Sequence, residues 1–177
     1  MYALFEDAGK FHAGRVMSAA ETSVQIELDS GKRVKVKTAQ VLLRFEQPAP
    51  ADLFVRARTL ATEIDLDLAW TFAPDAEFGF ADLARDYFDA TAGAEQQAAA
   101  LFRLFEAPHY FRRLGKGQFR KAPEDTVKAA LLYPGLGVLE TGNFSVGRGT
   151  ETPFEIYGAP WLDAETLCAR LGDLSRY

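Results

Sequence analysis

The stretch TSVQIELDSGKRVKVK, residues 22–37, alternates apolar and polar side chains on both sides of a tight turn. Val24 and Ile26 fall on one face, the DSGK turn reverses the chain, and Val34 and Val36 continue the same face. Because side chains in a strand alternate between two faces, this pattern predicts two antiparallel strands with one buried side.

The alternating pattern extends outward from this stretch over most of the first 46 residues, through FHAGRVMSA before it and QVLLRF after it. Several short strands with tight turns in fewer than about fifty residues predict a small SH3-like barrel at 1–48. The prolines of EQPAPAD each remove a backbone donor and restrict the residue before them. They predict a linker near 46–51.

Beyond this linker the apolar residues recur at helical spacing, over 53–64, 80–88 and 98–105. The turn DATAGAE separates the last two of these segments. After them, HYFRRLGKGQFRKA at 109–122 flanks LGKG with aromatic residues, which predicts a β-hairpin. The order helix, turn, helix, hairpin is that of a winged helix, so a winged-helix module is predicted at 52–131.

Residues 132–177 have a different character, because six glycines and three prolines lie between Tyr133 and Trp161. A helix signal returns only at Asp163, which is placed as an N-cap. The prediction is a short Gly/Pro-rich tail that ends in a helix and is not an autonomous domain. The predicted fold class of the whole chain is therefore α+β.

Composition excludes several classes of function. With a single cysteine and two histidines the sequence offers no disulfide and no zinc-ligand spacing, and no catalytic nucleophile arrangement is recognisable. No metal or other cofactor is expected in this chain. The absence of a long apolar run predicts no membrane partner, and acidic residues in the first ten positions predict a cytoplasmic location.

One segment is strongly basic although the net charge is −5. Residues 109–121 contain five Lys or Arg and no acid, interleaved with aromatic residues. Such a segment could bind single-stranded RNA through phosphate contacts and base stacking. Alternatively, the aromatic side chains pack inward and the charges keep a sheet edge soluble. The candidate RNA contacts are Tyr110, Phe111, Arg112, Arg113, Lys116, Phe119, Arg120 and Lys121.

A second, weaker basic patch is formed by Arg33, Lys35 and Lys37, which lie opposite the apolar face of the first hairpin. These side chains are a further candidate RNA surface. The alternative is that they only keep an exposed strand soluble.

The GRGT at 147–150 invites comparison with a phosphate loop. Gly142 to Gly147 fits G-x-x-x-x-G, but Arg148 and Gly149 follow where that loop needs Lys and then Ser or Thr. A nucleotide-binding loop is therefore not predicted. Glu140, Asn143 and Arg148 remain candidates for holding a polar ligand, and the alternative is an ordinary glycine-rich turn.

Residues 1–131 resemble the N-terminal part of a bacterial ribonuclease II-type exoribonuclease. The resemblance lies in SGKRVKVKTAQVLLRF, EFGFADLARDYF and APHYFRRLGKGQFRKAPEDTVKAAL. It implies a chain that binds single-stranded RNA but lacks the catalytic domain, in which clustered aspartates hold Mg²⁺ for hydrolysis from the 3′ end. The expected function is RNA binding without catalysis, and the alternative is a winged-helix interaction or DNA-binding module.

Residues 132–163, LYPGLGVLETGNFSVGRGTETPFEIYGAPWLD, resemble an internal motif of the exo-acting N-acetylmuramidases of peptidoglycan recycling. The resemblance implies a sugar-site motif with Glu140, Asn143 and Arg148. The catalytic acid of that family is expected upstream, so Glu140 does not inherit this role. A fragment of a muramidase is therefore a further alternative, and the two resemblances predict a junction near 131–133.

Overall fold

The alternating stretch at 22–37 forms one edge strand and its neighbour in a five-stranded antiparallel sheet with strand order β4-β3-β2-β1-β5. The computed structural model describes residues 1–174. The chain forms two compact units, Met1–Ala122 and the residues from Pro123 onward, and each is described by itself. The strands of the first sheet are β1 (Tyr2–Asp7), β2 (Lys10–Ala19), β3 (Ser23–Leu28), β4 (Arg33–Lys37) and β5 (Val41–Phe45), and a short 3-10 turn, η1 (Thr38–Gln40), joins the last two.

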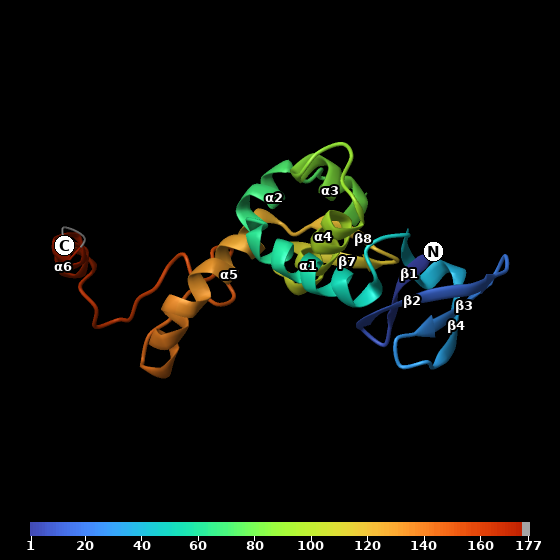
Figure 1. Ribbon diagram of the computed structural model, residues 1–177. Coiled ribbons are helices and arrows are strands. Elements are labelled where there is room, and N and C mark those ends of the chain that lie inside the picture. Colours follow the sequence, from blue (N-terminus) through green and yellow to red (C-terminus); the bar gives the residue numbers. More distant parts are fainter. Residues whose placement is uncertain (175–177) are drawn as a thin grey trace. The chain divides into compact units, whose positions relative to one another are not determined.

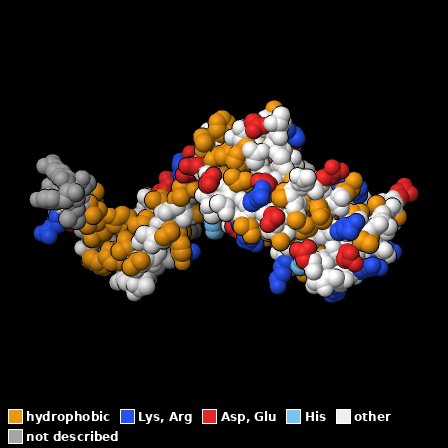
Figure 2. Space-filling model, viewed as in Figure 1, with side chains coloured by type: hydrophobic (Ala, Val, Ile, Leu, Met, Phe, Trp, Pro, Cys, Tyr) orange, Lys and Arg blue, Asp and Glu red, His pale blue; other side chains and the backbone are white. Residues whose placement is uncertain are grey.

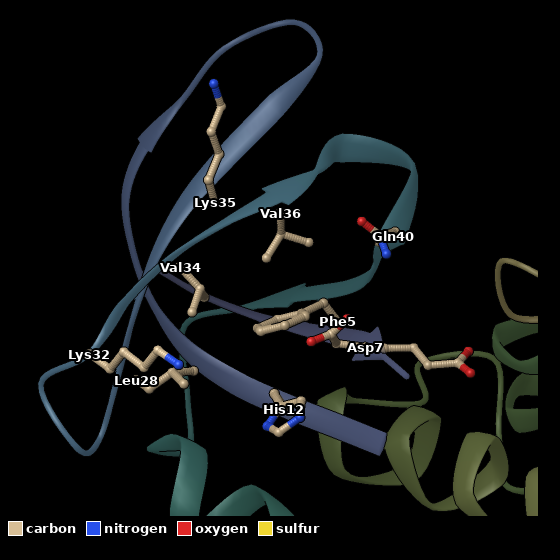
Figure 3. Close-up of a pocket in the computed structure, with 10 residues that line it drawn as sticks. Phe5, Asp7, His12, Leu28, Lys32, Val34, Lys35, Val36 and Gln40 are labelled. Carbon is tan, nitrogen blue, oxygen red and sulfur yellow. The ribbon is translucent and has the colours of Figure 1, made fainter. Parts of the chain in front are cut away.

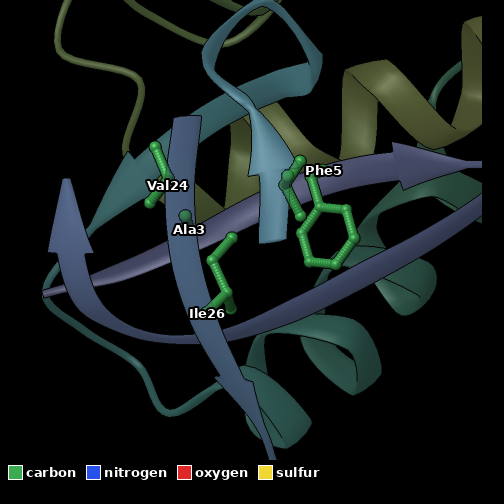
Figure 4. Close-up of a cluster of buried hydrophobic side chains, with 5 residues drawn as sticks. Ala3, Phe5, Val24 and Ile26 are labelled. Atoms are coloured by element: carbon green, nitrogen blue, oxygen red, sulfur yellow. The ribbon is translucent and has the colours of Figure 1, made fainter. Parts of the chain in front are cut away.

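The register of this sheet follows the apolar pattern. Val24 pairs with Val36 and Ile26 with Val34, so the apolar residues of the hairpin occupy one face. Ala3 and Phe5 of β1 join Val24, Ile26 and Val36 in a buried cluster. Figure 4 shows Ala3 and Phe5 of β1 beside Val24 and Ile26 of β3. Burial of this cluster on one side of the sheet fixes the register, because a slip by one residue would expose it.

Four helices follow the first sheet in the first unit (Figure 1). Pro50 occupies the first turn of α1, where its missing N–H costs nothing, and the Asp65 carboxylate accepts a hydrogen bond from the Leu68 N–H (2.9 Å) as the N-cap of α2. The central helix α4 packs against both α1 and α3. The bounds are α1 (Pro50–Glu63), α2 (Leu66–Phe72), α3 (Phe80–Tyr87) and α4 (Ala94–Glu106).

The predicted hairpin at 109–122 is present as β7 (Phe111–Gly115) and β8 (Gln118–Lys121). The short strand β6 (Phe78–Gly79) adds to β8 and gives a second antiparallel sheet with order β6-β8-β7. Gly117 closes the turn with φ +72°, and a Cβ atom there would lie 2.7 Å from the Phe80 ring. Only glycine meets both requirements, so this residue fixes how closely the hairpin approaches α3.

A cluster of aromatic rings joins the first sheet to the helices. Phe11 of β2 lies 5.1 Å from Phe102 and 4.7 Å from Phe105, both in α4, between ring centroids. Phe54 of α1 stacks on Phe102 with ring centroids 5.6 Å apart. The sheet and the helices of the first unit therefore share one aromatic contact, centred on the buried Phe102.

The second unit contains α5 (Glu124–Leu136), a short 3-10 turn, η2 (Gly137–Thr141), and α6 (Ala164–Leu174). Helix α5 begins with two acidic residues after Pro123 and continues through Pro134 to Leu136. Helix α5 therefore extends across the domain boundary predicted between residues 131 and 132. Pro134 removes one backbone hydrogen bond near the helix end but does not end the helix. The predicted terminal helix is α6.

The α+β class predicted from the sequence is confirmed, with two antiparallel sheets and six α-helices in residues 1–174. The assignment to an SH3-like barrel and a winged helix stays a prediction, as do the domain limits 1–48, 52–131 and 132–177. No helix within the described residues has the length and apolar character needed to cross a membrane.

We expect Phe102→Ala to lower the free energy of unfolding of the first unit by about 3–5 kcal/mol, because it leaves a cavity between α1, α4 and β2. Chemical denaturation followed by circular dichroism measures this. The control is Phe72→Ala, at a ring that is 56% exposed, which should change stability by less than about 0.5 kcal/mol. A loss below about 1 kcal/mol for Phe102→Ala would contradict the central role of this contact.

Candidate functional site

The aromatic residues of the β7–β8 hairpin face the core of the first unit. Phe111 and Phe119 are 0% and 2% exposed, and Tyr110 is 9% exposed. Phe78 packs edge-on against Phe111 at 5.9 Å. Their burial leaves no ring face on which a base could stack, so the inward-packing alternative describes these three residues.

Most basic residues of the hairpin already have partners. Arg113 pairs with Glu6 of β1 (Nη2 to Oε1, 2.7 Å) and lies over the Phe105 ring at 3.6 Å. Arg120 lies 3.5 Å from Glu77. Lys121 lies 3.4 Å from Asp75 and 4.2 Å from the centre of the Trp70 ring.

The hairpin is therefore not a uniformly positive surface. Arg112 and Lys116 are exposed, but the other three basic side chains meet acidic groups that neutralise them. Figure 2 shows basic side chains interspersed with acidic ones on the visible face of the first unit. Such mixing suits solubility rather than attraction of a polyanion.

The second basic patch lies on the edge strand β4. Arg33 pairs with Glu27 of β3 (3.2 Å), while Lys35 and Lys37 are exposed. Charged side chains on an edge strand hinder pairing with another sheet.

A cavity of about 180 Å³ opens beside this strand, between β1, β2 and β4 (Figure 3). Its apolar wall includes Phe5 and Val36, and Figure 3 shows the Lys35 side chain pointing away from Phe5. His12 stacks beside Phe5 with ring centroids 5.6 Å apart. The cavity is smaller than most small-molecule sites, which measure roughly 300–1,000 Å³.

The glycine-rich stretch at 142–158 forms a closed loop in the second unit. Ser145 and Gly158 exchange two backbone hydrogen bonds of 2.9 Å, and the Phe154 N–H donates to the Val146 carbonyl (2.8 Å). Gly147 has φ +74°, and a Cβ atom there would lie 2.8 Å from the Ile156 side chain. The glycines of GRGT thus allow the tight backbone conformation of a turn, as expected for an ordinary glycine-rich turn.

Aromatic side chains hold this loop against α5. Phe154 is buried, and Tyr133 of α5 meets it edge-on at 5.2 Å. The Arg148 guanidinium lies over the Phe154 ring at 4.9 Å and near the Tyr133 ring at 5.8 Å. A cation placed over an aromatic face is attracted by the ring quadrupole, so Arg148 is oriented by the loop itself.

The loop presents polar and aromatic groups together. Asn143 is exposed two residues before the Ser145–Gly158 bridge that closes the loop, and Trp161, three residues after that bridge, is 59% exposed while its ring meets Phe144 at 5.0 Å. The side chain of Glu140 lies outside the part of the chain that the structure describes. An amide, an oriented guanidinium and a flat indole are groups that can hydrogen-bond and pack against a saccharide.

Asp163, the acid nearest to Trp161 in sequence, acts as a helix cap. Its carboxylate accepts hydrogen bonds from the Thr166 hydroxyl and the Glu165 N–H (3.2 Å) at the start of α6. The Thr166 hydrogen bond, and then the backbone hydrogen bonds, hold the pKa of Asp163 below its ordinary value. This carboxyl group therefore stays ionised near neutrality and is unsuited to donate a proton to a leaving group.

No group of three or more His, Cys, Asp or Glu side chains within residues 1–174 is placed to hold a metal ion. The expectation of no cofactor in this chain stays a prediction.

Comparison with known proteins assigns the C-terminal segment alone. Residues 131–176 match a family described as "Exo-beta-N-acetylmuramidase NamZ, C-terminal". A peptidoglycan β-N-acetylmuramidase, NamZ, of Bacillus subtilis (strain 168) is 43% identical over 49 residues, which are 28% of this chain and 12% of that protein. The chain thus covers about an eighth of the curated relative's length. No solved structure matches the chain.

These matches confirm the muramidase resemblance, with a start one residue before the predicted 132. They overturn the RNA-binding, ribonuclease II-like class and the single-stranded RNA partner, because the matched family is a glycosidase rather than a nuclease. The physical reason for the error is that a basic, aromatic hairpin has the same composition whether its rings face outward or, as here, inward.

Sequence reasoning did not select Trp161 as a candidate. A tryptophan inside a Gly/Pro-rich loop, without helical or strand spacing, has no regular core position and could have signalled exposure.

We expect Tyr110→Phe to lower stability by about 0.5–1.5 kcal/mol at neutral pH, because the Tyr110 hydroxyl donates to the Asp67 carboxylate (3.0 Å). Burial, and then this hydrogen bond, raise the pKa of Tyr110 above 10.0. The folded chain therefore holds this proton when the unfolded chain has lost it. The resulting stability is present below about pH 10 and is lost as the pH rises through the folded pKa.

Urea unfolding at pH 7 and at several values above pH 10 measures this difference. The gap between the wild type and Tyr110→Phe should shrink at alkaline pH, while Tyr2→Phe serves as the matched control. A constant gap would contradict the assigned hydrogen bond.

Proposed function

We propose that this chain is a fragment of a peptidoglycan exo-β-N-acetylmuramidase and that its C-terminal segment binds the sugar of a muropeptide. The observation that carries this proposal is the family match over residues 131–176, supported by 43% identity to the Bacillus subtilis muramidase over 49 residues. The first unit would then serve as an attached α+β module.

The geometry of the loop supports a saccharide ligand. The backbone hydrogen bonds between Ser145 and Gly158 close the loop, and the exposed groups on and beside it are Asn143, Arg148 and Trp161. An N-acetylmuramic acid sugar carries an acetamido group and hydroxyls, and its lactyl group ends in a carboxylate when no peptide is attached. The Asn143 amide can form hydrogen bonds with the acetamido group and the hydroxyls. The Arg148 guanidinium can bind the carboxylate, and the Trp161 indole can pack against the apolar face of the sugar ring.

Binding, and not hydrolysis, is proposed for the chain itself. Glycosidases place two carboxyl groups on either side of the scissile bond, roughly 5 to 9.5 Å apart, within a complete cleft. The chain spans 12% of the muramidase that it matches, and Asp163 is occupied as a helix cap. Sugar binding is therefore the activity that we propose for the matched segment.

The finer fold assignments belong to the same proposal. The strand order β4-β3-β2-β1-β5 supports an SH3-like barrel at 1–48, and the order α3, α4, β7, β8 supports a winged helix within 52–131. DNA binding by α4 would require a basic side chain directed toward the DNA. The Arg103 side chain of α4 instead donates a hydrogen bond to the Ile64 carbonyl (3.0 Å), so this contact does not favour DNA binding. A cytoplasmic location is retained as a proposal.

We expect a muropeptide disaccharide to change the fluorescence of Trp161, because a sugar ring that packs on the indole displaces water from it. The chain has two tryptophans, so the titration uses a Trp70→Phe background in which Trp161 is the reporter. Asn143→Ala should weaken the interaction about tenfold, equivalent to about 1.4 kcal/mol for lost hydrogen bonds.

Gln118→Ala, an exposed amide in the first unit, is the matched control and should leave binding unchanged. Cellobiose lacks the acetamido group and the carboxylate and should bind far more weakly. Equal responses to cellobiose and the muropeptide, or no response to either, would refute the proposal.

A further inference from the structure

Strand β4 lies at one edge of the first sheet, where β3 is its neighbour. A hydrogen bond stands just beyond each end of the β3–β4 ladder. The Thr38 N–H donates to the Thr22 carbonyl (3.1 Å), and the Leu28 N–H donates to the Lys32 carbonyl (2.9 Å). In an antiparallel ladder, hydrogen-bonded pairs alternate with pairs whose backbone groups point away from the partner strand. These two bonds therefore fix which residues of β4 face β3 and which face outward.

The outward backbone groups of β4 belong to Arg33 and Lys35. Between the two flanking bonds, every second pair is hydrogen-bonded, so Val34 and Val36 bond to β3. Arg33 and Lys35 then direct their N–H and C=O groups to the open edge. The next outward N–H, that of Lys37, donates to the Gln40 side chain (3.3 Å). The edge can thus receive a further strand at Arg33 and Lys35.

The cavity of about 180 Å³ lies on the apolar face of the same strand. Figure 3 shows Val34 and Val36 on the side of β4 that faces Phe5, and Lys35 on the other side. An apolar cavity of roughly 150 Å³ can hold a benzene molecule, so this cavity has room for one aliphatic side chain. A strand added to β4 would place every second side chain on this face.

The basic face of β4 selects the charge of an added strand. Arg33 pairs with Glu27 of β3 (3.2 Å). Lys35 is exposed and stands opposite the uncharged Gln25. Lysine at a sheet edge disfavours pairing with a basic strand, whereas opposite charges on adjacent strands attract each other. An acidic strand is therefore the partner that complements this edge.

We propose that β4 binds an extended acidic segment of another protein, which adds antiparallel to the edge at Arg33 and Lys35. Acidic side chains of this segment meet Lys35, and the aliphatic side chain opposite Val34 enters the cavity. In this mode of recognition the main-chain hydrogen bonds supply affinity and the cavity supplies specificity. The site lies wholly within the first unit, so peptide binding is independent of the sugar binding proposed for the second unit.

The probe is a fluorescein-labelled peptide, ETELETE-amide, whose central glutamates would lie opposite Arg33 and Lys35 and whose leucine would lie opposite Val34. Fluorescence anisotropy with the full chain should show saturable binding. Replacement of the peptide leucine by alanine should weaken binding about tenfold, because the apolar contact in the cavity is lost.

Backbone methylation of the peptide tests strand addition separately from charge. Methylation of the backbone nitrogens of the two central glutamates should abolish binding, because these N–H groups would donate to β4. The matched control is methylation of the leucine nitrogen, which would point away from β4 and should leave binding unchanged. Amide hydrogen exchange of Arg33 and Lys35 should also slow when the unmodified peptide binds.

A charge reversal tests the basic face. Lys35→Glu should weaken binding of the acidic peptide at least about fivefold and should strengthen binding of KTKLKTK-amide, because it reverses the charge at the edge. Arg112→Glu is the matched control, since Arg112 is an exposed basic side chain of β7 in the other sheet, and it should change neither affinity.

Three results would overturn the proposal. They are the absence of saturable binding by the acidic peptide, equal binding by the peptide methylated at its central glutamates, and an unchanged affinity for the acidic peptide in Lys35→Glu.

Discussion

The contact of Phe11 with Phe102 and Phe105 is the constraint on which the first unit depends. It joins β2, the central strand of the five-stranded sheet, to the helix α4, and it places Phe105 beneath Arg113, which in turn pairs with Glu6. The sheet, the helix and the hairpin therefore share one contact region. Because Arg113 bridges an aromatic ring and a carboxylate, the base of the hairpin serves the packing of the unit and is not available to a ligand.

The local patterns were predictable from the sequence, whereas the use of the hairpin was not. Period-two alternation determined the register of Val24 and Val36, since one buried face permits only one pairing. The hairpin at 109–122 also followed from its turn and flanking aromatics. Its partners Glu6, Asp75 and Glu77 are distant in sequence, so a segmental charge count could not anticipate their ion pairs.

The second unit shows the reverse situation. Its motif residues were selected from sequence, and the loop closed by Ser145 and Gly158 explains why glycines are needed there. The continuation of α5 through Pro134 was not predicted, because proline ordinarily interrupts a helix. The exposure of Trp161 was not predicted either, because a tryptophan is on average largely buried. The small core of this segment accompanies a match to a family over residues 131–176 that covers 12% of the curated relative's length.

The central claim is that the loop at 143–161, and not the hairpin at 110–121, is the ligand-binding surface. Amide chemical-shift mapping of the full chain by NMR tests it most directly, with a muropeptide disaccharide and a single-stranded RNA oligonucleotide titrated separately. The account predicts shifts confined to residues around 143–161 with the muropeptide, and none at the hairpin with RNA at physiological salt. Saturable shifts at 110–121 with RNA, and none at the loop with the muropeptide, would contradict it.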